Sequence, residues 1–146
     1  MKNLRSRTCL YCCLMGVMAI SSCVQFESNR IGNQTYLQAL KLRDDGKYAR
    51  ADRELQALVK GRTSVFGADA PETLEVRLAR AGLLTYTPRN AEAEMQLRAL
   101  LPVLERVFGA EHEKTLICHV HSVRLYKARV NTLKRSLGFA DGYLFS

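Results

Sequence analysis

The chain has 146 residues, of which 47% are hydrophobic and 25% are charged, and this is the composition of one small globular domain. It contains no Trp and few β-branched runs, which argues against a β-sandwich. The net charge of +8 is moderate, so it does not by itself indicate a nucleic-acid-binding protein.

The N-terminus has the features of an export signal. Lys2, Arg5 and Arg7 form a positively charged start, and residues 9–20 are apolar or small throughout. This apolar run has the length of a signal-peptide core and is shorter than the ~20 residues that span a bilayer. The pattern therefore predicts a signal peptide over residues 1–22.

The signal segment ends in Ile20-Ser21-Ser22-Cys23, which resembles the lipobox of bacterial lipoproteins. The resemblance implies that Cys23 is lipid-modified and that the protein is exported and membrane-anchored, at the outer membrane if the cell has one. A simple secretory signal, an uncleaved anchor and a cytoplasmic protein are the alternatives. Polar residues then predict a tether over residues 23–33, in which Cys23 carries the lipid.

Five helices are expected in a helical domain over residues 34–136, followed by a tail or cap over residues 137–146. Asn33 or Thr35 is expected to cap the first helix, and Asp69 to cap the third. Pro102 is expected to kink or break the fourth helix. The first expected helix ends at the Asp44-Asp45-Gly46 turn, and the third opens within residues 69–72 and ends at Thr87-Pro88. The others run from about residue 47 to 66, 90 to 108 and 113 to 134.

Apolar residues at helical spacing predict one buried stripe on each of these helices. The stripes expected on the last three helices are Leu74, Leu78, Ala81 and Tyr86; Met95, Leu97, Leu100, Leu101, Leu104 and Phe108; and Leu116, Val120, Val123 and Tyr126.

One stretch of the chain occurs twice. Residues 65–74 return as residues 107–116, an offset of 42, and the pattern of Ala and Leu before them is repeated at the same offset. A fixed period of this length predicts a repeat array in which each unit buries its apolar face on the next. The expected fold is therefore an all-α, short α-solenoid of antiparallel helix pairs.

The repeated Phe-Gly-Ala-(Asp/Glu)-x-x-x-Thr-Leu turn, followed by a helix and Ala91-Glu92-Ala93, resembles the kinesin-light-chain type of tetratricopeptide repeat (TPR). The resemblance covers about residues 36–128. It implies a scaffold with a concave face that binds a protein or peptide. The positions where this family has Asn-Leu-Ala hold Ala79-Arg80-Ala81 and His121-Ser122-Val123.

The most informative polar residues are basic. No acidic residue lies between Glu113 and Asp141, and several Lys and Arg residues do. Cationic side chains on a concave face would suit an acidic peptide or a terminal carboxylate, whereas a solvated surface is the plainer interpretation. The residues predicted to line a partner-binding groove are Arg77, Arg80, His121 and Arg124.

No catalytic motif is present in the sequence. Cys118, His119 and His121 are close together, but they do not share one helix face as metal ligands would, and Cys118 is expected to be a buried apolar residue. We therefore expect no enzyme activity, no cofactor, no metal and no nucleic-acid partner. The expected function is a membrane-anchored scaffold, and the alternative is a truncated or degenerate repeat fragment with a structural or oligomerising role.

Overall fold

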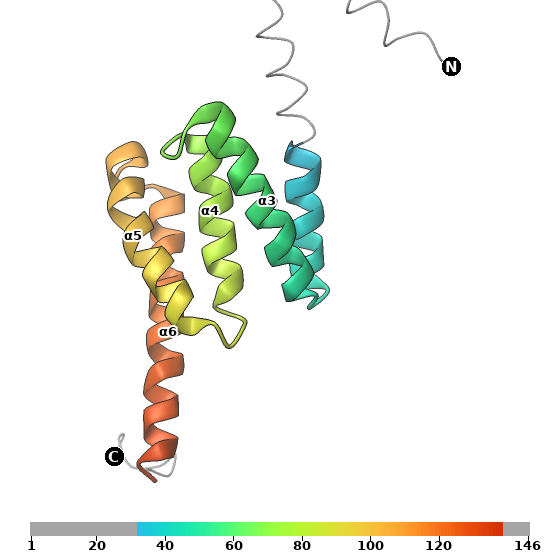
Figure 1. Cartoon of the computed structure of the whole chain (residues 1–146). Coiled ribbons are helices and arrows are strands. Elements are labelled where there is room, and N and C mark those ends of the chain that lie inside the picture. The colour runs from blue at the N-terminus through green and yellow to red at the C-terminus, as the bar shows by residue number, and fades with distance from the viewer. Residues whose placement is uncertain (1–31, 139–146) are drawn as a thin grey trace, which may run out of the picture.

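The computed structural model describes residues 32–138, and this part of the chain consists of five helices without a strand. The expected all-α class is thus confirmed. The predicted signal peptide, Cys23, most of the tether and residues 139–146 of the tail lie outside the described residues. An unlabelled helix over residues 32–44 comes first (Figure 1). It is followed by α3 (Tyr48–Phe66), α4 (Pro71–Leu84), α5 (Asn90–Phe108) and α6 (Glu113–Ser136).

The helices end and begin near the Gly and Pro residues of the sequence, but the capping residues differ from the expected ones. The first helix already includes residue 32, so Asn33 and Thr35 lie within it and do not cap it. Ala70, not Asp69, precedes Pro71 at the N-terminus of α4, and no side chain caps that end. Among α3 to α6, only α6 has a side-chain cap, because the Nδ1 atom of His112 accepts a hydrogen bond from the backbone N–H of Lys114 at 3.1 Å.

The helices form two layers with α4 between its neighbours. In the view of Figure 1, α3 and α5 lie in front of the first helix and α6. α4 contacts α3, α5 and α6, and its Val76 and Leu83 pack with Ala39 and Leu42 of the first helix. Because α4 has neighbours on most sides, more than half of its residues are buried, instead of the single stripe that was expected.

The offset of 42 residues holds in the coordinates. α3 and α5 have 19 residues each, and each ends at a glycine with a left-handed φ, 95° at Gly67 and 98° at Gly109. Such a φ favours glycine, which ends both helices at equivalent points. Leu55 and Leu97, one period apart, are both 1% exposed. These two residues of α3 and α5 therefore have the same degree of burial in the two copies.

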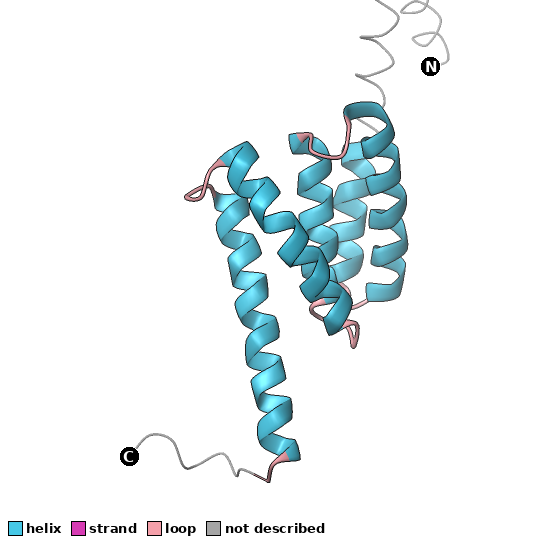
Figure 2. Cartoon of the chain, turned by 60° about the vertical axis from the view of Figure 1, so that its left-hand side comes forward, coloured by secondary structure: helices cyan, strands magenta, loops and turns pink. Residues whose placement is uncertain are grey.

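α6 departs most from expectation. The stripe predicted to be buried, Leu116, Val120, Val123 and Tyr126, is 47–70% exposed, and the buried residues of α6 are Thr115, Cys118 and Leu125. The prediction was wrong because periodicity identifies an apolar face and does not tell whether a neighbour covers it. Figure 2 shows the C-terminal half of α6 extending beyond the other helices.

Two further predictions of buried residues were wrong. Tyr86 and Met95, expected in the core, are 48% and 65% exposed. α5 runs unbroken through Pro102, whose side chain faces solvent. The proline ring removes one backbone hydrogen bond on the solvent-facing side of the helix, where an unpaired carbonyl costs less than it would in the core. Within residues 32–138, no helix has the length and apolar character needed to cross a membrane.

Candidate binding surface

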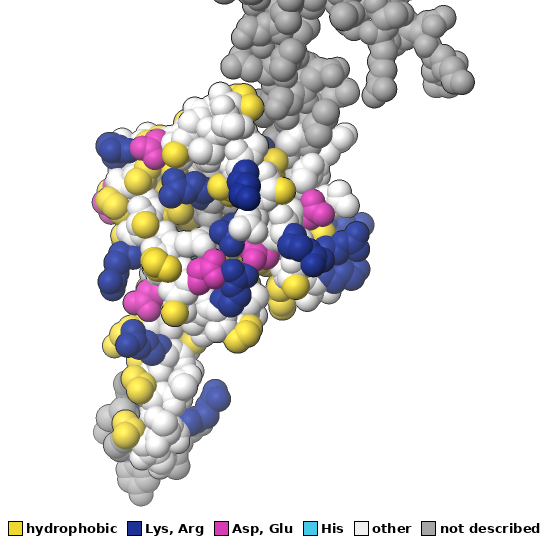
Figure 3. All heavy atoms as spheres, in the orientation of Figure 1, with side chains coloured by type: hydrophobic (Ala, Val, Ile, Leu, Met, Phe, Trp, Pro, Cys, Tyr) yellow, Lys and Arg dark blue, Asp and Glu magenta, His cyan; other side chains and the backbone are white. Residues whose placement is uncertain are grey.

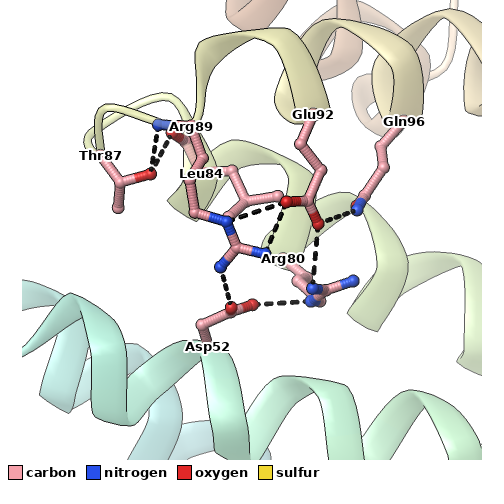
Figure 4. A network of polar contacts seen from close by, with 7 residues as sticks. All are labelled: Asp52, Arg80, Leu84, Thr87, Arg89, Glu92 and Gln96. Carbon is pink, nitrogen blue, oxygen red and sulfur yellow. Dashed lines mark hydrogen bonds and ion pairs between the residues drawn. The ribbon is translucent and has the colours of Figure 1, made fainter.

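A network of charged side chains joins three helices (Figure 4). Asp52 of α3 accepts hydrogen bonds from Nε of Arg80 on α4 at 2.7 Å and from Nη1 of Arg89, at the start of α5, at 2.5 Å. Glu92 of α5 pairs with Nη2 of Arg80 at 3.3 Å and Nη2 of Arg89 at 2.5 Å. Each carboxylate thus bridges the same two guanidinium groups.

Two members of the network are largely removed from solvent, since the side chains of Asp52 and Arg80 are 12% and 14% exposed, whereas Arg89 is 47% exposed. Burial alone would raise the pKa of Asp52, but the hydrogen bonds from Arg80 and Arg89 outweigh it and hold that pKa below its ordinary value. Asp52 is therefore ionised at neutral pH. Arg80, which was predicted to line the groove, is instead occupied in joining α3, α4 and α5.

An open hollow lies beside this network, with a volume of about 590 Å³. Its walls come from the start of α3 and from the loop between α4 and α5. Among its lining residues, Arg50 and Arg53 form no ion pair with any residue in the 32–138 range. The other charged and aromatic side chains that line the hollow are Lys47, Tyr48, Asp52, Tyr86 and Arg89.

Two tyrosines form the aromatic part of the hollow and connect it to α6. The rings of Tyr48 and Tyr86 stack with centroids 5.9 Å apart and an angle of 10° between their planes. The guanidinium of Arg124 lies 4.7 Å from the Tyr86 ring centroid, and its Nη1 donates to the Tyr86 hydroxyl. Arg124, one of the predicted groove residues, therefore extends the aromatic and basic surface of the hollow onto α6.

On the face seen in Figure 3, Lys and Arg side chains surround a few acidic side chains near the middle, and more of them gather at the edge of the molecule. Of the residues that line the hollow, four are basic and one is acidic, and that carboxylate, Asp52, is already paired. A ligand in the hollow would thus meet positive charge next to aromatic rings.

His121 lies where α6 approaches α4 most closely. A Cβ atom added to Gly82 of α4 would be 2.5 Å from Nε2 of His121, so the imidazole occupies the space that a larger residue would take. Nδ1 of His121 is buried and has no hydrogen-bond partner in the described part of the chain. Burial, together with the charges of Arg124 and Arg43, lowers the pKa of His121, so the ring is neutral at pH 7.

The four predicted groove residues do not form one cluster. Arg80 contacts α3 and α5, and Arg77 donates to the backbone oxygen of Ala68 at 3.1 Å. Gly82, which meets His121, is on the opposite side of α4 from Arg80, because residues two apart on a helix diverge by about 200°. The structure brings His121 and Arg124 together on α6 and leaves Arg77 and Arg80 elsewhere.

Cys118 is fully buried, as expected, and its Sγ lies 3.6 Å from the backbone oxygen of Leu97. Burial, with a smaller effect from Glu105, raises the pKa of the Cys118 thiol to about 11. The thiolate is therefore disfavoured at neutral pH. Among residues 32–138, His, Cys, Asp and Glu side chains form no group of three or more that could hold a metal ion.

Sequence reasoning missed Tyr48, Arg50 and Arg53 as candidate binding residues. Tyr48 was expected in the apolar stripe of its helix, and the signal for a site appears only when the loop after α4 brings Tyr86 beside it. Comparisons with protein-family models, with curated proteins and with solved structures found no match to this chain.

We expect Asp52→Asn to lower the free energy of unfolding by about 3 kcal/mol at pH 7, because it leaves the largely buried Arg80 with one carboxylate partner fewer. The folded-state pKa of Asp52 is depressed, so its contribution is complete above about pH 4 and is lost as the pH falls further. Urea unfolding measured at pH 7 and pH 3 should show a large difference in stability between wild type and variant at pH 7 and a smaller difference at pH 3.

Asp69→Asn is the matched control, because Asp69 pairs with Arg106 at the surface and is 54% exposed. Its removal should change stability by less than about 0.5 kcal/mol. Equal effects of the two substitutions at pH 7 would contradict a structural role for the network.

We expect Gly82→Ala to destabilise the wild-type protein by about 1–3 kcal/mol, because the new methyl group collides with His121. In a His121→Ala background the same change should stabilise by up to about 1 kcal/mol, since alanine is the better helix former. A double-mutant cycle on thermal or urea unfolding measures the coupling. Additive effects would show that the two residues do not touch in solution.

Proposed function

We propose that this protein is a non-enzymatic scaffold of TPR-like helix pairs, anchored to a membrane through a lipid on Cys23, that binds a protein or peptide partner carrying acidic side chains. The observation that carries the proposal is the open hollow lined by Tyr48 and Tyr86 and by Arg50 and Arg53, two arginines without an ion-pair partner among residues 32–138. It offers a partner aromatic surface and guanidinium groups, and no group activated for chemistry is part of it.

The proposed TPR-like arrangement is supported by the packing of the first four helices. The first helix pairs with α3, and α4 pairs with α5, at an offset that places Ala51 and Ala93 in the same fully buried position. Helices of one layer also touch each other, as α4 does the first helix and α6. This is how stacked helix pairs build a continuous core from small repeats.

Recognition of an acidic segment follows from the chemistry of the hollow. Guanidinium groups bind carboxylates through paired hydrogen bonds, and Arg50 and Arg53 are free to do so. The stacked tyrosines supply an amphipathic surface for an apolar side chain next to the carboxylate. A short peptide that alternates acidic and apolar residues matches both features.

Anchoring at the membrane is inferred from the residues before the helical domain. Cys23 follows a positively charged and apolar segment and precedes the first described helix by nine residues. Acyl chains contribute about 0.8 kcal/mol per buried methylene, so a multiply acylated Cys23 would hold the domain at the bilayer surface. A cytoplasmic location is the alternative.

The second candidate is a truncated or degenerate repeat fragment with a structural or oligomerising role. The exposed stripe on α6 favours it, since an apolar face that nothing covers invites self-association. Light scattering after size-exclusion chromatography separates the two functions, because the oligomerising role requires a stable oligomer and the scaffold does not.

The binding proposal predicts that a fluorescein-labelled peptide of alternating Glu and Leu binds the full-length protein at least about tenfold more tightly than the same peptide with Lys for Glu. Arg50→Glu combined with Arg53→Glu should weaken binding of the Glu peptide by about tenfold or more, and added salt should weaken it in wild type. Fluorescence anisotropy measures both effects.

Arg98→Glu serves as the control, because Arg98 is 83% exposed on α5 and does not line the hollow. It should change the affinity by less than about twofold. If the double variant binds the Glu peptide as wild type does, the hollow is not the binding site.

The anchoring proposal predicts that the protein in the membrane fraction begins at an acylated Cys23, with a mass that lacks residues 1–22 and includes the lipid. Cys23→Ala should abolish both the lipid and the cleavage. Intact mass spectrometry of both fractions tests this, and an unprocessed Met1 terminus in the soluble fraction would refute the anchor.

A further inference from the structure

The last helix presents an apolar stripe to solvent. Leu116, Val120 and Val123 share one face of α6 and are 47%, 58% and 53% exposed. Three neighbouring apolar side chains with this exposure are costly to leave in water, and contiguous apolar patches of this kind mark interaction sites.

The equivalent residues of the preceding helix pair show what kind of element packs on such a face. Leu74, Leu78 and Ala81 of α4 lie 42 residues earlier and are 0%, 5% and 0% exposed. They belong to a core that includes Ala93, Leu97, Leu100 and Leu104 of α5. α6 therefore repeats the face of α4 that α5 covers, but no helix in the described part of the chain covers it on α6.

We propose that this face of α6 binds an amphipathic helix of a partner protein, which carries an Ala and Leu stripe flanked by acidic side chains and packs on α6 as α5 packs on α4. The pattern of α5 defines the stripe, because its buried residues are spaced by four, three and four positions. The site shares no residue with the basic hollow, so it does not depend on the function proposed above.

The preceding helix pair indicates what kind of occupant fits this face. The equivalent face of α4 is covered by α5, a helix of 19 residues, so the occupant that we propose for α6 is a helix of similar length.

Charge argues against a second copy of α6 as the occupant and for an acidic helix. Lys127 and Lys134 continue the line of the stripe toward the C-terminus, and neither has an ion-pair partner within residues 32–138. No acidic residue follows Glu113 on α6. Pairing two copies of α6 would bring like charges together, whereas carboxylates on a partner helix would meet both lysines.

The test uses the full-length protein in a non-ionic detergent and a labelled 19-residue peptide that has Ala, Leu, Leu and Leu at the α5 spacing and Glu at the exposed positions. A matched peptide has Lys in place of each Glu. We expect the Glu peptide to bind at least about tenfold more tightly than the Lys peptide in fluorescence anisotropy. Lys127→Glu combined with Lys134→Glu should reverse this preference.

Val120→Asp combined with Val123→Asp should weaken binding of the Glu peptide by about tenfold or more. Both side chains are already exposed, so circular dichroism should remain that of wild type. Met95→Asp is the control, since Met95 is 65% exposed on α5, outside the stripe, and should leave binding unchanged. The hollow variant with Glu at positions 50 and 53 should also leave it unchanged, which separates this site from the hollow.

Three results would overturn the proposal. The first is equal binding of the Glu and Lys peptides, or binding of neither. The second is a wild-type dimer in light scattering that the two Asp substitutions convert to a monomer, because a second copy would then occupy the face. The third is a gain of about tenfold in peptide affinity when the chain is stopped after Gly138, because the tail would then be the native occupant.

Discussion

The guanidinium of Arg80, held between the carboxylates of Asp52 and Glu92, is the interaction on which the arrangement of the middle helices depends. It ties α4 to both helices of the opposite layer, through Asp52 of α3 and Glu92 of α5. An ion pair that is largely removed from solvent is costly to break, because loss of one partner leaves the remaining charge incompletely compensated. The network therefore specifies one packing of three helices.

The same network shapes the basic hollow beside it. Arg89 is held by Asp52 and Glu92, and this fixes the start of α5 and the loop that carries Tyr86. Tyr86 in turn stacks on Tyr48 and contacts Arg124. A surface that is assembled before a partner arrives loses less conformational entropy on binding than a flexible one. The charged network thus helps to shape the hollow, because it holds the loop that carries Tyr86 in place.

Much of the fold follows from local features of the sequence. Gly67, Gly109 and Pro71 mark helix ends, and the repeated turn fixes the register of the two copies, so the bounds of α3, α4 and α5 were predictable. The burial pattern of α6 was not predictable, because the spacing of Leu116, Val120 and Val123 identifies an apolar face but does not tell whether another helix covers it. Here the repeat itself was the better guide, since it places these residues on the face that α5 covers in the preceding unit.

The site was harder to predict than the fold, for a related reason. Arg80 and Asp52 are 28 positions apart, and nothing local in the sequence tells that they meet. The groove residues were chosen by the helix on which they lie, without knowledge of which side of α4 faces which layer. Arg77 and Arg80 were therefore grouped with His121. Arg124 contacts the ring of Tyr86, a neighbour that the pattern of α6 alone does not indicate. Contacts across layers depend on packing that the pattern of one helix does not contain.

The position of Leu125 as the last buried residue of α6 gives this helix an uneven stability along its length. Beyond it, Tyr126 to Ser136 form eleven residues without a buried side chain, and isolated helices of this length are marginal in water. Backbone amides of this segment should therefore exchange with deuterium well before those near Cys118, which only larger openings expose. A partner that binds along α6 would also stabilise this C-terminal segment. Amide exchange of the segment would therefore report whether α6 is bound.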